Sequence, residues 1–188
     1  MSFFNFESQF TFYGQYHSNK VNVICHVVCV PLIYWSALVL SMNVGLLTTT
    51  EVFGNVYLPA VVSLAYSLFY IYLEPVAGLM YTPILGGIAY HATNFYQTSP
   101  QANNIAIAIH IFAWICQFYT HAFHEKRAPA LLDNIAQALL FAPFFVFFEI
   151  IFQLGYRPSF KRRLQNNIGK AITIYRRQLK NQGKKARS

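Results

Sequence analysis

Charged residues are scarce in this sequence. Lysine, arginine, aspartate and glutamate make up 11% of its 188 residues, whereas they form roughly a quarter of an ordinary soluble domain. Apolar residues make up 55%, and phenylalanine and tyrosine are abundant. The shortage of charge excludes a typical soluble globular domain and predicts an integral membrane protein of a single domain, embedded in the lipid bilayer.

Cysteine is also rare. The chain has three, Cys25, Cys29 and Cys116, and each lies within an apolar run. This pattern excludes the disulfide framework of a small secreted protein. Cys25 and Cys29 flank His26, so a thiolate metal ligand is one alternative, but we expect small buried residues inside helices.

The few charges are divided unevenly along the chain. Residues 1–125 contain one basic residue and four acidic ones, a net charge of −3, whereas residues 126–188 contain thirteen basic and two acidic ones, a net charge of +11. The basic character is therefore a property of the C-terminal part. Because this part adjoins an apolar segment, it predicts contact with a membrane surface and not with nucleic acid.

The tail from Lys161 onward has ten basic residues and no acidic one. Apolar residues recur in it at helical spacing, which predicts an amphipathic helix lying on anionic lipid. The positive-inside rule then places the C-terminus in the cytosol. We therefore divide the chain into an integral membrane domain, 1–158, and a basic amphipathic cytosolic tail, 159–188; a solvated or disordered tail is the alternative. The apolar positions are Leu164, Ile168, Ile172, Tyr175 and Leu179.

Long uncharged runs predict an all-α, polytopic membrane helix bundle of four to six membrane segments. An aromatic-rich stretch at 3–16 precedes them and predicts an interfacial helix that ends near Gly14. The third run contains Pro83, Gly86 and Gly87, so we expect it to be broken or re-entrant. The runs are 21–47, 53–73, 76–96, the stretch from Ser99 to just before Pro129, and 134–154.

Polar residues predict where several of these helices begin. Asn22 is the expected N-cap of the first run, which places His26 one turn inside that helix and His17 in the connection before it. Ser99 followed by Pro100 predicts another helix start, and Asp133 predicts the last. A polar turn is expected at 48–51.

The stretch 104–131 is mostly apolar, but polar and ionisable residues recur along it at helical spacing. His110, Trp114, Gln117 and His121 follow at steps of four, three and four, then come His124 and Glu125, so on an α-helix they share one face. Ionisable groups at membrane depth are costly and usually face a protein interior or a wet cavity. One helix face is therefore expected to present imidazoles and a carboxylate to a buried partner, with a metal ion as the leading candidate.

Three histidines can meet if the first and fourth segments pack together. These are His17, His26 and His121, and imidazole suits zinc, iron, copper and nickel. Glu125, one turn after His121, is a candidate fourth ligand, acid/base or carboxylate that orients a histidine. From the residues alone, the alternative is that each histidine makes an ordinary hydrogen bond between helices.

Two blocks of the sequence resemble a known family. YHSNKVNVICHVVCVP from Tyr16, and QFYTHAFHEKRAPALLDNIAQALLFAPFFVFFEIIFQLGYRP from Gln117, resemble the fungal 2-hydroxy fatty acid dioxygenases of the endoplasmic reticulum, which carry out the α-oxidation step of phytosphingosine breakdown. The resemblance covers most of 10–158 and is absent from the tail. Its motif positions are Tyr16, His17, Asn19, Asn22, His26, His121, Glu125, Pro129, Ala130 and Leu131.

The resemblance implies an Fe(II)-dependent enzyme of the endoplasmic reticulum membrane that uses O2 to shorten a 2-hydroxy fatty acid by one carbon. It implies His17, His26 and His121 as the metal ligands and Glu125 as a catalytic group that orients a ligand or relays protons. Arg127 and His110 are weaker candidates for substrate binding. No role is carried over to His124, where the family has an apolar residue.

Two other functions remain open at this point. One is a membrane metalloenzyme with another metal, such as a zinc hydrolase that acts on a lipid head group. The other is a non-enzymatic membrane scaffold whose basic tail holds anionic lipid or a partner protein.

Overall fold

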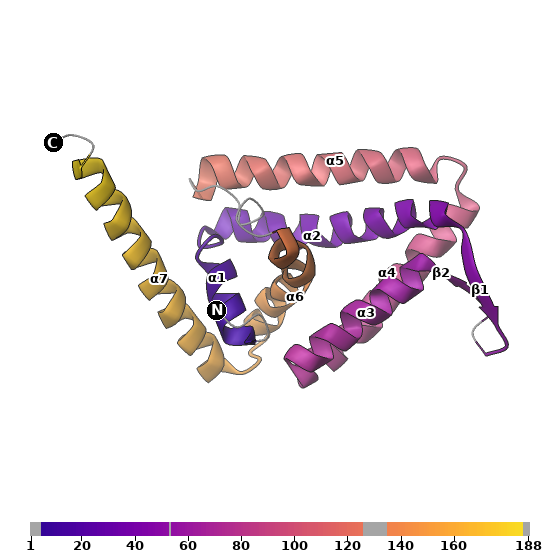
Figure 1. Ribbon diagram of the computed structural model, residues 1–188, viewed down its shortest axis with the longest axis horizontal. Coiled ribbons are helices and arrows are strands. Elements are labelled where there is room, and N and C mark those ends of the chain that lie inside the picture. The colour runs from indigo at the N-terminus through magenta and orange to yellow at the C-terminus, as the bar shows by residue number, and fades with distance from the viewer. Residues whose placement is uncertain (1–4, 53, 126–134, 186–188) are drawn as a thin grey trace.

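The structure is a computed structural model, and it describes residues 5–52, 54–125 and 135–185. These residues form helices and one small antiparallel hairpin (Figure 1), so the predicted, mainly α-helical class is confirmed. The α-helices are α1 (Phe6–Gly14), α2 (Lys20–Ser41), α3 (Leu58–Leu73), α4 (Pro75–Thr98), α5 (Ala102–Thr120), α6 (Ile135–Gln153) and α7 (Pro158–Lys185). The other elements are the 3₁₀-helix η1 (Met42–Val44), the π-helix η2 (His121–Glu125), and the strands β1 (Leu46–Thr50) and β2 (Gly54–Tyr57).

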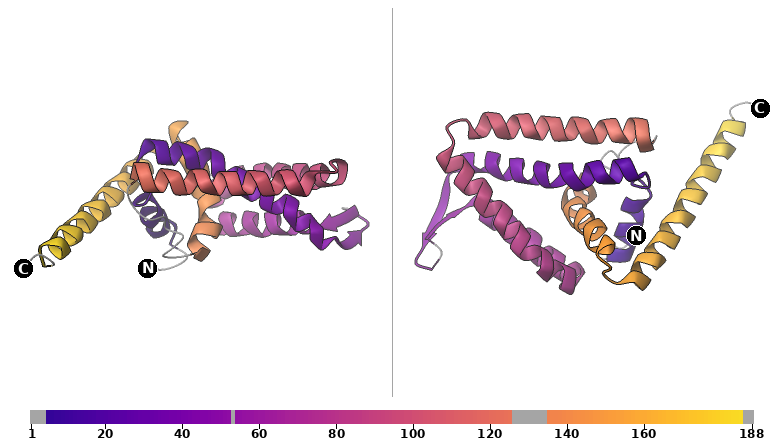
Figure 2. Two further views of the ribbon diagram at one scale, coloured as in Figure 1. Left: turned by 90° about the horizontal axis from the view of Figure 1, so that it is seen from above. Right: turned by 180° about the vertical axis from the view of Figure 1, so that it is seen from behind.

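Two long helix pairs organise the molecule. α2 and α5 lie side by side, and α3 packs along α4 (Figures 1 and 2). α2 and α5 run in opposite directions, so the end of α5 lies beside the beginning of α2. α3 and α4 approach closely because Gly78 has no side chain; a Cβ atom there would overlap the backbone of Ile71. The end of the α2–α5 pair that carries residues 20–26 and 117–125 is also where α1 meets α2.

An aromatic core holds α6 between α1 and the α3–α4 pair. The ring of Phe148 lies 4.7 Å from that of Phe6, and the rings of Phe144 and Tyr70 stack at 4.4 Å with 4° between their planes. Tyr13 of α1 lies 4.6 Å from Phe145. Large rings bury much apolar surface and interlock, so this cluster fixes the position of α1 and of the chain that follows it.

Two helices of the described chain are both long and apolar enough to cross a membrane. They are Lys20–Val44 and Ala102–Glu125, of 25 and 24 residues, and α3 and Leu139–Gln153 are shorter apolar helices. The predicted number of four to six membrane segments stays a prediction. Run 53–73 yields a helix of 16 residues because its first residues form β2.

The α4 helix differs from its prediction. The sequence predicted a broken or re-entrant segment at 76–96, but α4 continues without interruption over 24 residues with Pro83 inside it. Gly86 and Gly87 lie within the same helix and face open space. Packing along α3 compensates for the poor helix propensity of these three residues.

Three predicted local features are wrong. Asn19, not Asn22, caps α2, and its Oδ1 accepts a hydrogen bond of 2.9 Å from the Val21 amide. Ser99 ends α4, and Gln101 precedes α5. Residues 46–57 form a hairpin and not a simple turn at 48–51, because consecutive threonines favour strands and Gly54 adopts a positive φ of 66°. The expected caps and ends at Pro129 and Asp133 lie outside the described residues.

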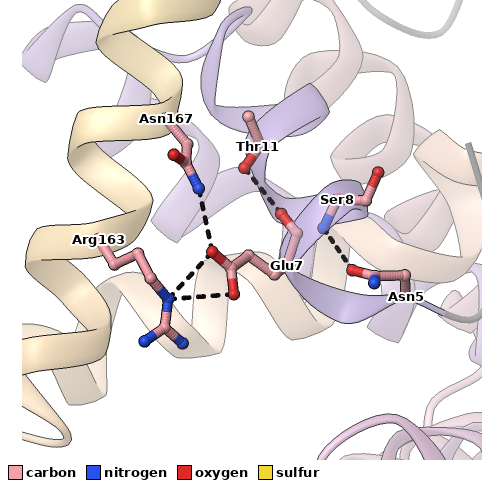
Figure 3. Close-up of polar contacts among 6 residues, drawn as sticks. All are labelled: Asn5, Glu7, Ser8, Thr11, Arg163 and Asn167. Carbon is pink, nitrogen blue, oxygen red and sulfur yellow. Dashed lines mark hydrogen bonds and ion pairs between the residues drawn. The ribbon is translucent and has the colours of Figure 1, made fainter.

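The C-terminal helix α7 starts on α1 and then diverges from the rest of the molecule (Figures 1 and 2). Phe160 and Leu164 are buried at its beginning. The carboxylate of Glu7 accepts hydrogen bonds from Arg163 Nε at 3.1 Å and Asn167 Nδ2 at 3.0 Å, and Figure 3 shows both side chains reaching it from α7. The tail is thus helical up to Lys185 and attached to α1. Its placement on a membrane and the division at 158/159 stay predictions.

Candidate metal centre

The structure brings together the three histidines that the sequence singled out. His17 lies in the connection between α1 and α2, His26 lies in the second turn of α2, and His121 begins the π-helix after α5. One ring nitrogen from each lies within 4.8 Å of those of the other two. The ring centroids are 4.4, 4.9 and 4.9 Å apart, with angles of 78° to 86° between the planes. Three ring nitrogens this close to one another could share one metal ion.

Backbone carbonyls determine which nitrogen two of these rings present. His17 Nδ1 lies 2.9 Å from the Tyr13 carbonyl oxygen, and His26 Nδ1 lies 2.9 Å from that of Asn22. A carbonyl oxygen only accepts, so each Nδ1 carries the hydrogen and each Nε2 keeps a free lone pair. This is the arrangement in which a protein orients an imidazole towards a metal ion.

The three histidines are buried, and two of their ring nitrogens have no hydrogen-bond partner. His17, His26 and His121 are 8%, 4% and 3% exposed. Among the described residues, the buried side-chain atoms without a hydrogen-bond partner are His17 Nε2, His121 Nδ1 and Gln117 Nε2. Buried polar atoms are nearly always paired, and leaving one unpaired is costly. The two free imidazole nitrogens therefore fit a bound metal cation, which these three histidines could hold.

Burial also keeps His17 in the form that binds metal. Removal from water lowers the pKa of His17 well below the ordinary histidine value of 6.5, and the neighbouring His26 lowers it further. The neutral ring, which is the metal-binding form, is thus the stable one near neutral pH. The Tyr13 ring stacks on His17 at 3.8 Å and contributes to this burial.

Glu125 ties the His17 connection to the end of α5. Its carboxylate accepts hydrogen bonds from Ser18 Oγ at 2.6 Å, from the Asn19 amide at 2.9 Å and from Asn22 Nδ2 at 3.3 Å. A carboxylate at the start of α2 is also favoured by the free amides and the dipole of that helix. Both oxygens contact the connection, so the geometry favours the orienting role among those considered for Glu125.

A second hydrogen bond supports the same junction. The Thr120 hydroxyl donates to Asn22 Oδ1 at 2.8 Å, and Asn22 Nδ2 also reaches the Tyr16 carbonyl oxygen at 3.3 Å. Asn22 is fully buried. The sequence predicted a capping role for Asn22 and no role for Ser18. The residue pattern around His17 was the only indication that these side chains support the histidine cluster.

The π-helix changes which residues face the site. Its wider turn lets His121 point inwards while His124 is exposed. The expectation that His121, His124 and Glu125 share one α-helical face is therefore wrong at His124. Single π turns in longer helices are frequent at functional sites.

One of the two substrate-binding candidates, His110, is bonded outside the centre. His110 Nε2 accepts a hydrogen bond of 3.0 Å from Trp114 Nε1, and its Nδ1 lies 2.9 Å from Ser36 Oγ. Both ring nitrogens are occupied, so His110 links α2 to α5 and has no free lone pair. Arg127 lies outside the described residues.

The cysteines do not belong to the group of potential metal ligands. All three are free thiols, and Cys25 Sγ lies 3.8 Å from Cys29 Sγ. The group of potential metal ligands found in the described chain consists of histidines only. The expectation of small residues buried within helices agrees with Cys29, while Cys25 and Cys116 are half-buried.

An apolar cavity begins at the three histidines and runs between α2, α5 and α6. On α2 its lining extends from His26 to Ala37, which is about 16 Å of helix at 1.5 Å per residue. Val30, Ile33, Phe118 and Leu139 contribute to its walls, and no lysine or arginine of the described chain lines it. The cavity thus has the three histidines at one end, called its head below, and mainly apolar walls along the rest of its length.

Together these features define a class: a mainly helical protein with two apolar helices of spanning length and a candidate three-histidine metal centre at the head of an apolar cavity. Residues 3–154 match the family model described as "2-hydroxy-palmitic acid dioxygenase Mpo1-like". The chain belongs to this family, and the resemblance seen in the sequence is confirmed.

One relative is the 2-hydroxy-palmitic acid dioxygenase MPO1 of Saccharomyces cerevisiae. It is 33% identical over 164 residues, which cover 86% of this chain and 88% of the yeast protein. No solved structure matches the chain. The family match includes all three histidines and Glu125 but not α7.

Proposed function

We propose that this protein is an Fe(II)-dependent dioxygenase that shortens 2-hydroxy fatty acids by one carbon, the α-oxidation step of phytosphingosine breakdown. One observation carries the proposal: in a member of the Mpo1-like family, three buried histidines bring ring nitrogens within 4.8 Å of one another at the head of an apolar cavity. A metal needs such a cluster, and a fatty acid needs such a cavity.

The metal would be held by His17, His26 and His121. Three neutral imidazoles suit Fe(II) and leave coordination positions for other ligands. When bound, iron would relay electrons from the substrate to O2 and act as a template for a substrate whose hydroxyl and carboxylate can both coordinate it. The reaction balances without an external reductant if one 2-hydroxy acid and one O2 give the acid one carbon shorter, carbon dioxide and water.

The protein's own residues bind and orient the substrate. Apolar side chains such as Val30, Ile33 and Phe118 would surround the acyl chain and exclude water from the head of the cavity. The polar head would then lie against the histidines. Glu125, through Ser18 and Asn19, would keep the His17 ring in place.

The cellular setting belongs to the same proposal. Two helices of spanning length support a multi-pass membrane protein. The family resemblance would place it in the endoplasmic reticulum, and the positive-inside rule would place its C-terminus in the cytosol. The basic residues of the tail would contact anionic lipid, since ten of them follow residue 160 without an acidic one. Arg127 stays a candidate for attracting the substrate carboxylate.

The direct test is reconstitution. Purified protein is stripped of metal, loaded with Fe(II) without oxygen, and then given O2 and 2-hydroxypalmitic acid, and mass spectrometry looks for pentadecanoic acid. Fe(II) should restore product formation and Zn(II) should not. Zinc-dependent release of a lipid head group would support the hydrolase instead. A function that survives His121→Ala but is lost when Arg176, Arg177 and Lys180 are neutralised would support the scaffold.

A further inference from the structure

Gln117 is a buried polar residue that lacks a partner at the head of the cavity. It lies one turn before His121 on α5, is 6% exposed, and lines the same cavity as the three histidines. Its Nε2 has no hydrogen-bond partner. Burying an amide without a partner is unfavourable, and a leucine of similar size would fill the same space without that cost.

Several other polar groups along the cavity are already engaged. The Tyr34 hydroxyl bonds to Ser63 Oγ at 2.7 Å, and the Tyr66 hydroxyl donates to the Leu139 carbonyl oxygen at 3.2 Å. Trp114 Nε1 donates to His110. Among the described residues, Gln117 Nε2 is the one fully buried amide, hydroxyl or indole atom of a side chain that is left without a hydrogen-bond partner.

The charges around the cavity limit what Gln117 can bind. No lysine or arginine of the described chain lines the cavity, so an anionic head group there would rely on the metal for its charge and on neutral donors for its remaining oxygen atoms. An unpaired N–H group beside the histidines is such a donor. Asn22 and Thr120, which also lie near this junction, are bonded to each other and not available.

We propose that Gln117 is a substrate-positioning residue whose Nε2 donates a hydrogen bond to the carboxylate of the bound 2-hydroxy fatty acid. This inference rests on the proposed function. The hydrogen bond places the head of the acid against the histidines while its chain follows α2 towards Ala37. It also makes the cavity selective for acids over the corresponding alcohols.

The test is equilibrium binding to Fe(II)-loaded, full-length protein without oxygen, so that no turnover occurs. Gln117→Leu should bind 2-hydroxypalmitic acid about tenfold more weakly or worse, because a hydrogen bond to a charged group is lost. Its iron content should be unchanged. Gln117→Glu, which has the same shape and no donor when ionised, should lose at least as much. Gln101→Leu, at an exposed position just before the same helix, is the matched control and should bind normally.

Two further measurements separate positioning from packing. Without fatty acid, Gln117→Leu should raise the melting temperature of the protein, because an unpaired buried amide has been removed; a packing role predicts a decrease. With 1,2-hexadecanediol, which has no carboxylate, wild type and Gln117→Leu should bind alike.

The inference is overturned if Gln117→Leu or Gln117→Glu binds the acid as tightly as wild type, if the diol shows the same loss as the acid, or if wild-type protein binds no fatty acid. Wild-type protein that binds the acid but never shortens it contradicts the dioxygenase proposal. If Gln117→Leu still binds that acid more weakly, the assignment of Gln117 is supported independently.

Discussion

Histidines lie within the α2–α5 pair, at His110, and at one end of it, in the cluster of His17, His26 and His121, and the two places differ in their hydrogen bonds. At His110, Trp114 and Ser36 occupy both ring nitrogens. At the other place, His17 and His121 each keep a buried nitrogen without a partner. Both places combine histidine with a helix of spanning length, so residue type alone does not distinguish a structural histidine from a candidate ligand. What distinguishes them is whether a ring nitrogen is left without a hydrogen-bond partner.

The two places also differ in how they are held. His110 bridges two helices through its own ring. Two of the clustered histidines, His17 and His26, are held from behind by the carbonyl oxygens of Tyr13 and Asn22, and the Glu125 carboxylate fixes the connection that carries His17. A ring whose Nδ1 is hydrogen-bonded in this way keeps its position while its Nε2 binds a ligand.

The largest expected effect comes from removing one clustered ring. His121→Ala should lower the affinity for Fe(II) and the rate of product formation by at least about 100-fold, because a ligand is lost and not merely its support. His110→Ala on the same helix is the control and should keep its iron. Metal analysis after dialysis, together with product formation, measures both. Equal iron loss in the two variants would remove the distinction between the two places.

The next effect concerns Glu125. Glu125→Gln should weaken Fe(II) binding by about 10- to 100-fold, since a neutral amide holds Ser18 and the start of α2 less strongly than a carboxylate does. Titration of metal-free protein with Fe(II) under anaerobic conditions gives the affinity. A variant with normal affinity and no turnover would instead assign Glu125 to proton transfer.

The third prediction uses pH on metal-free protein. The pKa of His17 lies well below 6.5 in the fold, so in mild acid the unfolded chain binds a proton that the folded chain does not. Stability is then complete above about pH 6.5 and falls as the pH decreases towards the folded pKa, by up to about 1.4 kcal/mol per pH unit for this group. Thermal unfolding in detergent between pH 8 and 5 measures the change. His17→Asn should flatten this dependence, and an unchanged slope would refute the assignment to His17.

Sequence reasoning succeeded where a single residue type controls the outcome. The residues alone offered His17, His26 and His121 as one set that could meet, the family resemblance favoured it, and the structure brings the three together. The break after Gly14 was predicted from composition, and α1 does end there. These inferences depend on local composition and on the cost of burial.

The failures came from tertiary context. Asn22 carries the pattern of an N-cap, but Asn19 starts α2 earlier and leaves Asn22 to bond with Thr120 and Glu125. The π turn at His121 rotates His124 outwards, and a strict α-helical spacing cannot reveal that extra residue. Gln117 was recognised as one of the polar residues at helical spacing, but its unpaired nitrogen becomes visible only once the surrounding groups are placed.

The smallest expected effect tests the structural histidine itself. Ser36→Ala removes the partner of His110 Nδ1 and should lower the free energy of unfolding by about 1 kcal/mol, the usual net value of one hydrogen bond. Iron content and product formation should not change, since neither residue belongs to the cluster. Chemical denaturation in detergent gives the stability, and the same preparations give the iron content. Loss of iron from Ser36→Ala would show that the His110 link and the metal centre form one coupled unit, because the link would then set the distance between α2 and α5 at the histidines.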